Sequence, residues 1–354
     1  MTRMRITTKR PGAAPLPVVD MTTSIGALVL PSPVMTASGC AASGRELDQF
    51  VDVTRLGAVV TKSVMLRPRS GRPTPRMSET PSGMLNAIGL QGPGIDAFCE
   101  TDLAWLRRRG ARTVVSIAGD SVEEYTRLAQ RLRNTDGVSA VEVNISCPNV
   151  EDRGLVFACD PAAAAAVLTA VRRNTAPSVP VLAKLSPDVT DLVQVARAVV
   201  DAGADALSMI NTTLGMVIDP DTLRPTLAGL TGGLSGPAIR PLAVRCVWQV
   251  HEAMPQVPIS GMGGIRTGLD ALEFILAGAS AISVGTVLFN DPSAPTRILR
   301  ELTVALADRG FERLCDAVGY AHRPQDGGQE HVPAGAAAHA HPDDFGPDVD
   351  TAAQ

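Results

Sequence analysis

Aromatic residues are scarce in this chain, and neither charge is in large excess. Phe, Trp and Tyr make up 3% of its 354 residues, and the formal net charge is −4. No basic stripe with interleaved aromatic residues is present, which argues against nucleic-acid binding. Hydrophobic residues reach 45%. One large core can therefore be buried, and α/β barrels often run to this length as a single domain.

Leader, membrane and metal-binding patterns are also lacking. The basic start, Met1-Thr-Arg-Met-Arg5, has no apolar signal-peptide run. No uncharged apolar stretch reaches the ~18 residues that span a bilayer. We therefore expect a soluble, cytoplasmic protein. The six cysteines form no Cys-x-x-Cys pair, and their gaps fit neither a zinc site nor an iron–sulfur ligand set. We expect no bound metal, and an iron–sulfur cluster would have to lie on another chain.

Apolar runs of strand type alternate with longer helical patterns. The predicted strands are Pro33–Ala37, Ala58–Lys62, Thr113–Ile117, Ala140–Asn144, Val181–Leu185, Ala206–Ile210, Val257–Gly261 and Ala281–Gly285. The clearest predicted helices are Ser121–Arg133, Asp160–Arg173, Thr190–Ala202 and Thr267–Ala277. Eight strands, each followed by helical sequence, predict an α/β fold, a (β/α)8 TIM barrel. An open doubly wound sheet is the alternative, but residues 36–44 lack the Gly-x-Gly-x-x-Gly that would favour it.

Long loops are expected after strands 2, 4 and 6 of this barrel. Residues 65–94, rich in Pro, Gly and Arg, and residues 211–236 interrupt the alternation. Loops at the carboxyl ends of barrel strands usually build the active site. We predict an N-terminal extension over residues 1–20 and the barrel over 21–322. Residues 323–354 are rich in Gly, His, Asp and Ala, which predicts a disordered tail.

Glycines cluster after the last two predicted strands. They lie in Gly261-Met-Gly-Gly264 and in Gly285-Thr286. Backbone N–H groups can approach a phosphate closely where no side chain intervenes. A tight turn would explain either cluster alone, but two clusters on adjacent strand ends favour a phosphate-bearing cofactor.

Two lysines lie inside apolar strands, where an unpaired charge is costly. Lys62 follows Ala-Val-Val-Thr and Lys184 follows Pro-Val-Leu-Ala, with no acidic residue within three positions of either. A bound anion or an electron-rich cofactor would supply the missing partner. The alternative is a lysine that reaches solvent from the rim or pairs with a distant carboxylate.

A polar turn after the fourth strand presents Cys147 among hydroxyl and amide side chains. Asn86, Asn144 and Asn211 can each donate and accept hydrogen bonds, which suits a planar ligand with ring C=O and N–H groups. No histidine falls near a strand end, so proton transfer would fall to Cys147. Nearby cations would favour the required thiolate. A buried, inert thiol is the plain alternative.

Together these residues resemble the dihydroorotate dehydrogenase family over nearly the whole stretch from about Pro31 to Gly310. The catalytic-loop signature of that family matches Asn144-Ile-Ser-Cys-Pro-Asn149. Other matching stretches are Ala37–Gly39, Thr61–Ser63, Glu79–Gln91, Lys184–Pro187, Met209–Thr212, Thr231–Ala238, Gly261–Gly264 and Val284–Thr286. The forms of residues 86–90 and 232–236 resemble class 1B, whose catalytic subunit joins an electron-transfer subunit carrying FAD and a [2Fe-2S] cluster and passes electrons to NAD⁺.

The resemblance implies oxidation of (S)-dihydroorotate to orotate in pyrimidine (UMP) biosynthesis. Cys147 would take a proton from C5 while hydride passes from C6 to N5 of FMN, and a homodimer is expected. The implied substrate-binding residues are Lys62, Asn86, Ala87, Ile88, Gly89, Leu90, Asn144, Asn211 and Thr212. The implied FMN-binding residues are Ser38, Lys62, Ser63, Ser116, Asn144, Lys184, Ile210, Gly236, Gly263, Gly264, Gly285 and Thr286.

The sequence departs from the family pattern at a few positions. Ser116 replaces the usual flavin-contacting Asn, Gly92 replaces an Asn, and Thr213 adds a hydroxyl beside the substrate pair. Two alternatives stay open. One is a dihydropyrimidine dehydrogenase-like flavin reductase acting on a related ring, and the other is a non-catalytic paralogue. A cysteine-nucleophile hydrolase is disfavoured because no histidine is positioned to activate the thiol.

Overall fold

The computed structural model describes residues 18–145 and 159–324. Its main sheet has eight parallel strands in the order β3-β16-β15-β10-β9-β8-β7-β4. The bounds of these strands are β3 Val34–Thr36, β4 Val59–Val60, β7 Thr113–Ile117, β8 Ala140–Asn144, β9 Val181–Leu185, β10 Ala206–Met209, β15 Ile259–Met262 and β16 Ala281–Val284. The two end strands meet, because Gly57 N donates to Val34 O at 2.8 Å and Thr36 N donates to Ala58 O at 3.3 Å. The predicted barrel is confirmed.

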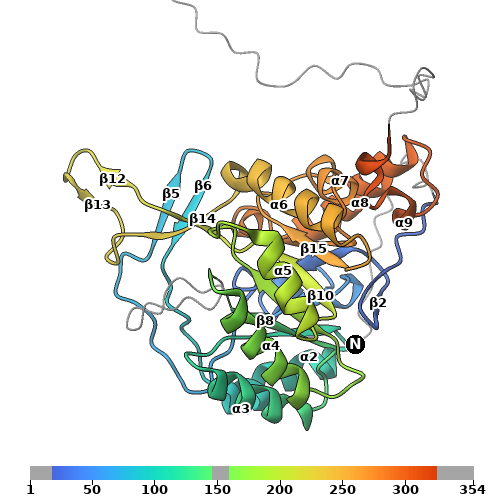
Figure 1. The fold of residues 1–354 in the computed structure, drawn as a ribbon. Coiled ribbons are helices and arrows are strands. Elements are labelled where there is room, and N and C mark those ends of the chain that lie inside the picture. The colour runs from blue at the N-terminus through green and yellow to red at the C-terminus, as the bar shows by residue number, and fades with distance from the viewer. Residues whose placement is uncertain (1–17, 146–158, 325–354) are drawn as a thin grey trace, which may run out of the picture.

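Helices follow the barrel strands and surround them (Figure 1). The α-helices are α1 Ile95–Phe98, α2 Ala104–Arg109, α3 Val122–Arg133, α4 Pro161–Asn174, α5 Leu192–Asp201, α6 Arg240–Ala253, α7 Gly268–Leu276, α8 Ala294–Ala307 and α9 Leu314–Ala317. A π-helical segment, η3 Cys99–Leu103, joins α1 to α2, and the 3-10 helices are η1 Leu47–Gln49, η2 Val53–Arg55, η5 Pro237–Ile239, η6 Thr286–Phe289 and η7 Tyr320–His322. Two of the predicted helices begin with side-chain caps, since Ser121 Oγ accepts from Glu124 N and Thr267 with Asp270 forms a capping box. No helix within the described ranges is long and apolar enough to cross a membrane.

The interior of the barrel is divided into an apolar end and a polar end. At the amino ends of the strands, Ala58, Val114, Leu182 and Ala281 pack together with the side chains of a hairpin. This hairpin consists of β1 Thr23–Ile25 and β2 Leu28–Leu30, and it contributes Ile25 and Leu30, both fully buried. Toward the carboxyl ends the buried side chains become polar: Ser116, Glu142, Asn144, Lys184, Ser208, Ser260 and Ser283.

The two predicted excursions pair with each other in a second sheet, which the sequence reading did not foresee. Its order is β11-β14-β6-β5, with antiparallel pairing throughout. The bounds are β5 Met77–Thr80, β6 Gly83–Asn86, β11 Thr213–Gly215 and β14 Gly232–Ser235, and a short pair, β12 Ile218–Asp219 with β13 Arg224–Pro225, extends beyond it. These strands lie to one side of the helical ring (Figure 1). The predicted loop after strand 4 falls largely on residues 146–158, outside the described residues.

Candidate active site

A cavity of about 620 Å³ lies at the carboxyl ends of the barrel strands. Its volume falls within the ~300–1,000 Å³ of small-molecule sites. Ten of the residues predicted from the sequence line it: Ser38, Lys184, Ile210, Asn211, Thr212, Gly236, Gly263, Gly264, Gly285 and Thr286. The parallel strand order is the reason, since it brings residues from distant parts of the sequence to one rim.

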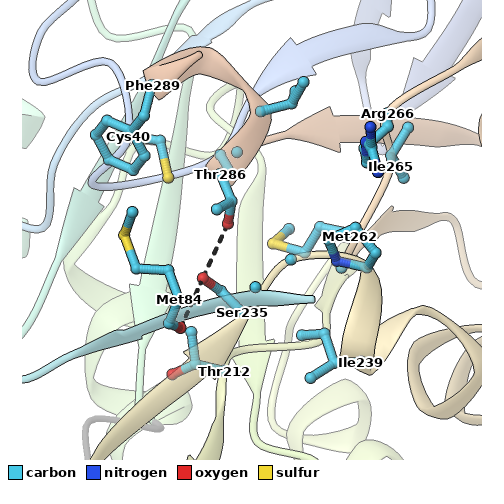
Figure 2. A pocket seen from close by; sticks show the side chains of 18 of the residues that line it. Cys40, Met84, Thr212, Ser235, Ile239, Met262, Ile265, Arg266, Thr286 and Phe289 are labelled. Carbon is cyan, nitrogen blue, oxygen red and sulfur yellow. Dashed lines mark hydrogen bonds between the residues drawn. The ribbon is translucent and has the colours of Figure 1, made fainter. Parts of the chain in front are cut away.

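The second sheet forms one wall of the cavity. The β5–β6 turn contributes Pro81 and Ser82 to the lining, and the start of β6 contributes Gly83. Figure 2 shows Thr286 Oγ1 donating to Ser235 Oγ at 2.9 Å, and Ser235 Oγ donating to the carbonyl oxygen of Met84 at 3.3 Å. These two bonds tie the end of barrel strand β16 to both excursions, so the wall has a fixed position relative to the rim.

The glycine turns after β15 and β14 approach each other too closely for side chains. Gly264 has φ +73°, and a Cβ there would lie 2.6 Å from the carbonyl oxygen of Gly236. Gly263 has φ +132°, and its Cβ would lie 2.8 Å from Ala243 Cβ. Both the backbone conformation and the space therefore require glycine. The result is a strip of bare backbone along the cavity, as a phosphate needs.

A hydrogen-bonded chain crosses the polar end of the barrel interior. Asn211 Nδ2 donates to Asn144 Oδ1 at 3.3 Å, and Asn144 Nδ2 donates to Ser63 Oγ at 3.0 Å. The hydroxyls of Ser63 and Ser116 are 2.9 Å apart, and Ser116 Oγ donates to Glu142 Oε1 at 2.9 Å. The two amides at the mouth are thus joined to a carboxylate deep in the barrel.

Glu142 corrects the expectation that a bound anion or cofactor would supply the partner of Lys184. Lys184 Nζ lies 3.9 Å from Glu142 Oε1, and the two side chains are 6% and 1% exposed. The partner is near because β8 and β9 are adjacent parallel strands with Asn144 opposite Lys184. Register places the carboxylate there, although 42 positions separate the two residues in the sequence. The alternative of a distant carboxylate is the one the structure supports.

Cys40 lines the cavity (Figure 2), as does Lys184. Burial raises the pKa of its thiol to about 11, and the ammonium groups of Lys184 and Lys62 only partly oppose this shift. A thiol with such a pKa stays protonated at neutral pH, so it is neither a base nor a good nucleophile there.

Comparisons with known proteins decide the family. A family model described as dihydroorotate dehydrogenase matches residues 20–306. The chain is 51% identical over 300 residues to a protein of Geobacter sp. (strain M21), with 85% of this chain and 97% of the relative covered. It is 53% identical over 300 residues to one of Pelobacter propionicus, with 85% and 98% covered. Both relatives are named dihydroorotate dehydrogenase B (NAD(+)), catalytic subunit.

The chain belongs to the dihydroorotate dehydrogenase family. The resemblance predicted from the sequence motifs, including its class 1B character, is thereby confirmed. The other predicted site residues that the structure describes do not line the cavity. They are Lys62, Ser63, Asn86, Ala87, Ile88, Gly89, Leu90, Ser116 and Asn144.

Two parts of the chain hold these remaining residues. Asn86 is on β6, where its Nδ2 donates to Gly233 O at 3.3 Å, and Ile88 O accepts from Arg72 N at 3.0 Å. Ser63, Ser116 and Asn144 form the interior chain described above. Ser116, fully buried, directs its hydroxyl to Glu142, and the Thr213 hydroxyl donates to Asp188. These bonds account for two of the departures from the family pattern.

Cys147, the predicted base, lies outside the described residues, as do Ser146 and Asn149. The strand that leads to it is firmly held. Tyr125 on α3 is 2% exposed, and its hydroxyl donates to the carbonyl oxygen of Asn144 at 2.7 Å. The last residue of β8 is thus fixed both through its backbone and through its side chain.

The sequence reading missed Glu142 and the cavity wall formed by the β5–β6 turn. Glu142 stands two positions before Asn144, so both side chains must project from the same face of the strand. The alternation of side chains along a strand could therefore have predicted that Glu142 points into the barrel. No such pattern indicated the pairing of the two excursions, because a long and irregular sequence separates their strands.

We predict that Cys40 resists alkylation at pH 8, because little of a thiol with a pKa of about 11 is ionised there. Its modification should accelerate as the pH rises through 10. The measurement is peptide mapping after timed treatment with iodoacetamide, with the exposed Cys159 and Cys315 as internal controls. Modification of Cys40 at pH 8 as fast as that of Cys159 would contradict the assignment.

Proposed function

We propose that this chain catalyses the FMN-dependent oxidation of (S)-dihydroorotate to orotate in de novo pyrimidine biosynthesis. The observation that carries the proposal is the cavity at the barrel rim, where Lys184, Asn211 and two glycine turns converge. This cavity lies in a chain about half identical to curated dihydroorotate dehydrogenases over nearly their whole length.

The lining fits a flavin mononucleotide in both of its chemical parts. Bare backbone at Gly263, Gly264 and Gly285 suits the phosphate, because a side chain at Gly264 would collide with Gly236. At the barrel axis, Lys184 offers a fixed positive charge to an electron-rich ring. Ser38 and Ile210 would complete the site between these two parts.

In this proposal Cys147 would act as a base and remove the proton from C5 of dihydroorotate. Asn144, Asn211 and Thr212 would hold the ring through amide and hydroxyl hydrogen bonds, and Lys62 and Asn86 would hold the carboxylate. When bound, FMN supplies the hydride acceptor for the hydrogen on C6.

We also propose that the electrons leave through a separate subunit that carries FAD and a [2Fe-2S] cluster, to NAD⁺, and that the chain forms a homodimer. The relatives are named as catalytic subunits, which supports the existence of a separate partner subunit. Large apolar side chains exposed around β11–β13 support assembly of some kind, since such clusters usually mark contact surfaces. They are Leu214, Met216, Ile218 and Leu223.

The purified chain should be yellow and should reduce a dye acceptor with dihydroorotate as substrate. Cys147→Ala should keep the flavin spectrum but lose roughly 10²–10⁴-fold in turnover, the usual contribution of a general base. Stopped-flow reduction of the flavin measures this directly. Undiminished turnover would remove Cys147 from the role of base, and oxidation of dihydrothymine instead of dihydroorotate would point to the related reductase. A colourless protein that cannot be reconstituted would favour a non-catalytic paralogue.

Gly264→Ala should weaken FMN binding by at least about tenfold, or 1.4 kcal/mol, because its Cβ would push the two turns apart. Fluorescence titration of the flavin-free chain with FMN measures the dissociation constant. Gly310→Ala is the matched control, since Gly310 has nearly the same φ, +77°, but no heavy atom within 4 Å of an added Cβ. Equal effects of the two substitutions would show that backbone strain, not the cavity, is responsible.

Co-purification tests the partner. An affinity-tagged chain isolated from its own cells should retain an iron–sulfur flavoprotein, and NAD⁺ reduction by dihydroorotate should require that partner. The isolated chain should still reduce artificial dyes. Efficient electron transfer to fumarate by this chain alone would contradict the class 1B assembly.

A further inference from the structure

Lysine is rare in this chain, and its positions are therefore informative. Of 32 basic residues, only Lys9, Lys62 and Lys184 are lysine, and all the others are arginine. Lys9 lies outside the described residues. The other two act together on the Cys40 thiol in the cavity. The chain uses arginine almost everywhere else, but it has lysine at positions 62 and 184. A lysine ammonium is a compact point charge, whereas an arginine guanidinium is planar and larger.

Lys184 is in a position where an ammonium loses nearly all of its hydration. It is 5% exposed, so its charge needs a compensating charge within the protein. Glu142 supplies that charge, because its carboxylate lies 3.9 Å from Lys184 Nζ. Removing either member of such a buried pair leaves the other charge uncompensated.

The hydrogen bonds around Glu142 have a single direction. An ionised carboxylate only accepts, so the Ser116 hydroxyl must donate to it. Ser116 Oγ then accepts from the Ser63 hydroxyl, which in turn accepts from Asn144 Nδ2. Each donor in the chain points toward Glu142. The carboxylate is thereby held by Ser116 on one side and faces Lys184 on the other.

We propose that Glu142 is a positioning residue that holds the Lys184 ammonium at the floor of the cavity, with Ser116 holding the carboxylate in place. Glu142 does not itself line the cavity, whereas Lys184 does. The effect on flavin chemistry rests on the proposed function, since a fixed ammonium stabilises negative charge that develops on a bound ring. The coupling between Glu142 and Lys184 is a property of the protein alone.

The rarity of lysine makes the coupling directly measurable. With ¹³C-lysine incorporated in the full chain, the Cε resonances come from three residues, and Lys184→Met identifies that of Lys184. Glu142→Gln should shift and broaden the Cε resonance of Lys184, because the ammonium then loses the carboxylate that holds it. Ser116→Ala should shift this resonance by less. A Lys184 resonance that is unchanged in Glu142→Gln would overturn the proposal.

Ser260→Ala is the matched control for loss of a buried polar group. Ser260 lies in the same interior layer and bonds the Ser283 hydroxyl at 3.0 Å, and its hydrogen bond does not involve Glu142. It should leave the Cε resonance of Lys184 where it is. A shift as large as that of Glu142→Gln would mean that general loosening of the interior, not the carboxylate, controls the lysine.

A stability cycle keeps the proposal falsifiable if Glu142→Gln folds poorly. The double variant E142Q/K184M carries neither buried charge, so it should melt at a higher temperature than the sum of the two single effects predicts. Strict additivity of the melting temperatures would overturn the pairing.

The NMR measurement and the activity assay together distinguish a failure of this inference from a failure of the proposed function. A shifted Lys184 resonance in a Glu142→Gln chain that does not oxidise dihydroorotate would keep the positioning role and refute the activity. Normal oxidation with an unshifted resonance would do the reverse. With both in place, flavin reduction should be slower in Glu142→Gln than in the wild type and in Ser260→Ala.

Discussion

The closed ring of parallel backbone hydrogen bonds is the constraint on which the rest of this structure depends. Once β3 and β4 meet through Gly57 and Thr36, all eight carboxyl ends share one rim. Residues that are far apart in the sequence then become neighbours through register alone. The pairing of Asn144 with Lys184 is one such case, and it brings Glu142 within reach of a lysine 42 positions away.

Much of the barrel could be predicted from the sequence, because its strands carry their own signal. Thr113–Ile117, Ala140–Asn144 and Val181–Leu185 have the predicted bounds, since continuous apolar runs mark buried parallel strands. The predicted strands Pro33–Ala37 and Ala58–Lys62 extend beyond the observed strands β3 and β4 at both ends. At the carboxyl ends the chain leaves the ladder for turns whose polar and small residues build the cavity, and sequence periodicity does not locate the last ladder bond.

The parts that escaped prediction depend on contacts between distant segments. The second sheet is built from Gly- and Pro-containing excursions with no strong alternation, and its strands become regular only when β6 meets β14. The partner of Lys184 escaped for the same reason, because proximity in sequence was the wrong measure of proximity across a sheet. For the site, the residue types were readable, whereas the division into cavity lining and supporting interior was not.

The interior of the barrel reconciles two opposing demands. A closed barrel must be filled with side chains, and an apolar filling is the cheapest. A charged group in that filling costs free energy unless another charge and hydrogen bonds accompany it. This chain places Ile25, Leu30 and Leu182 at one end and the Ser116–Glu142–Lys184 group at the other. The charges therefore lie beside the cavity, where a low dielectric would strengthen their action on a ligand bound there.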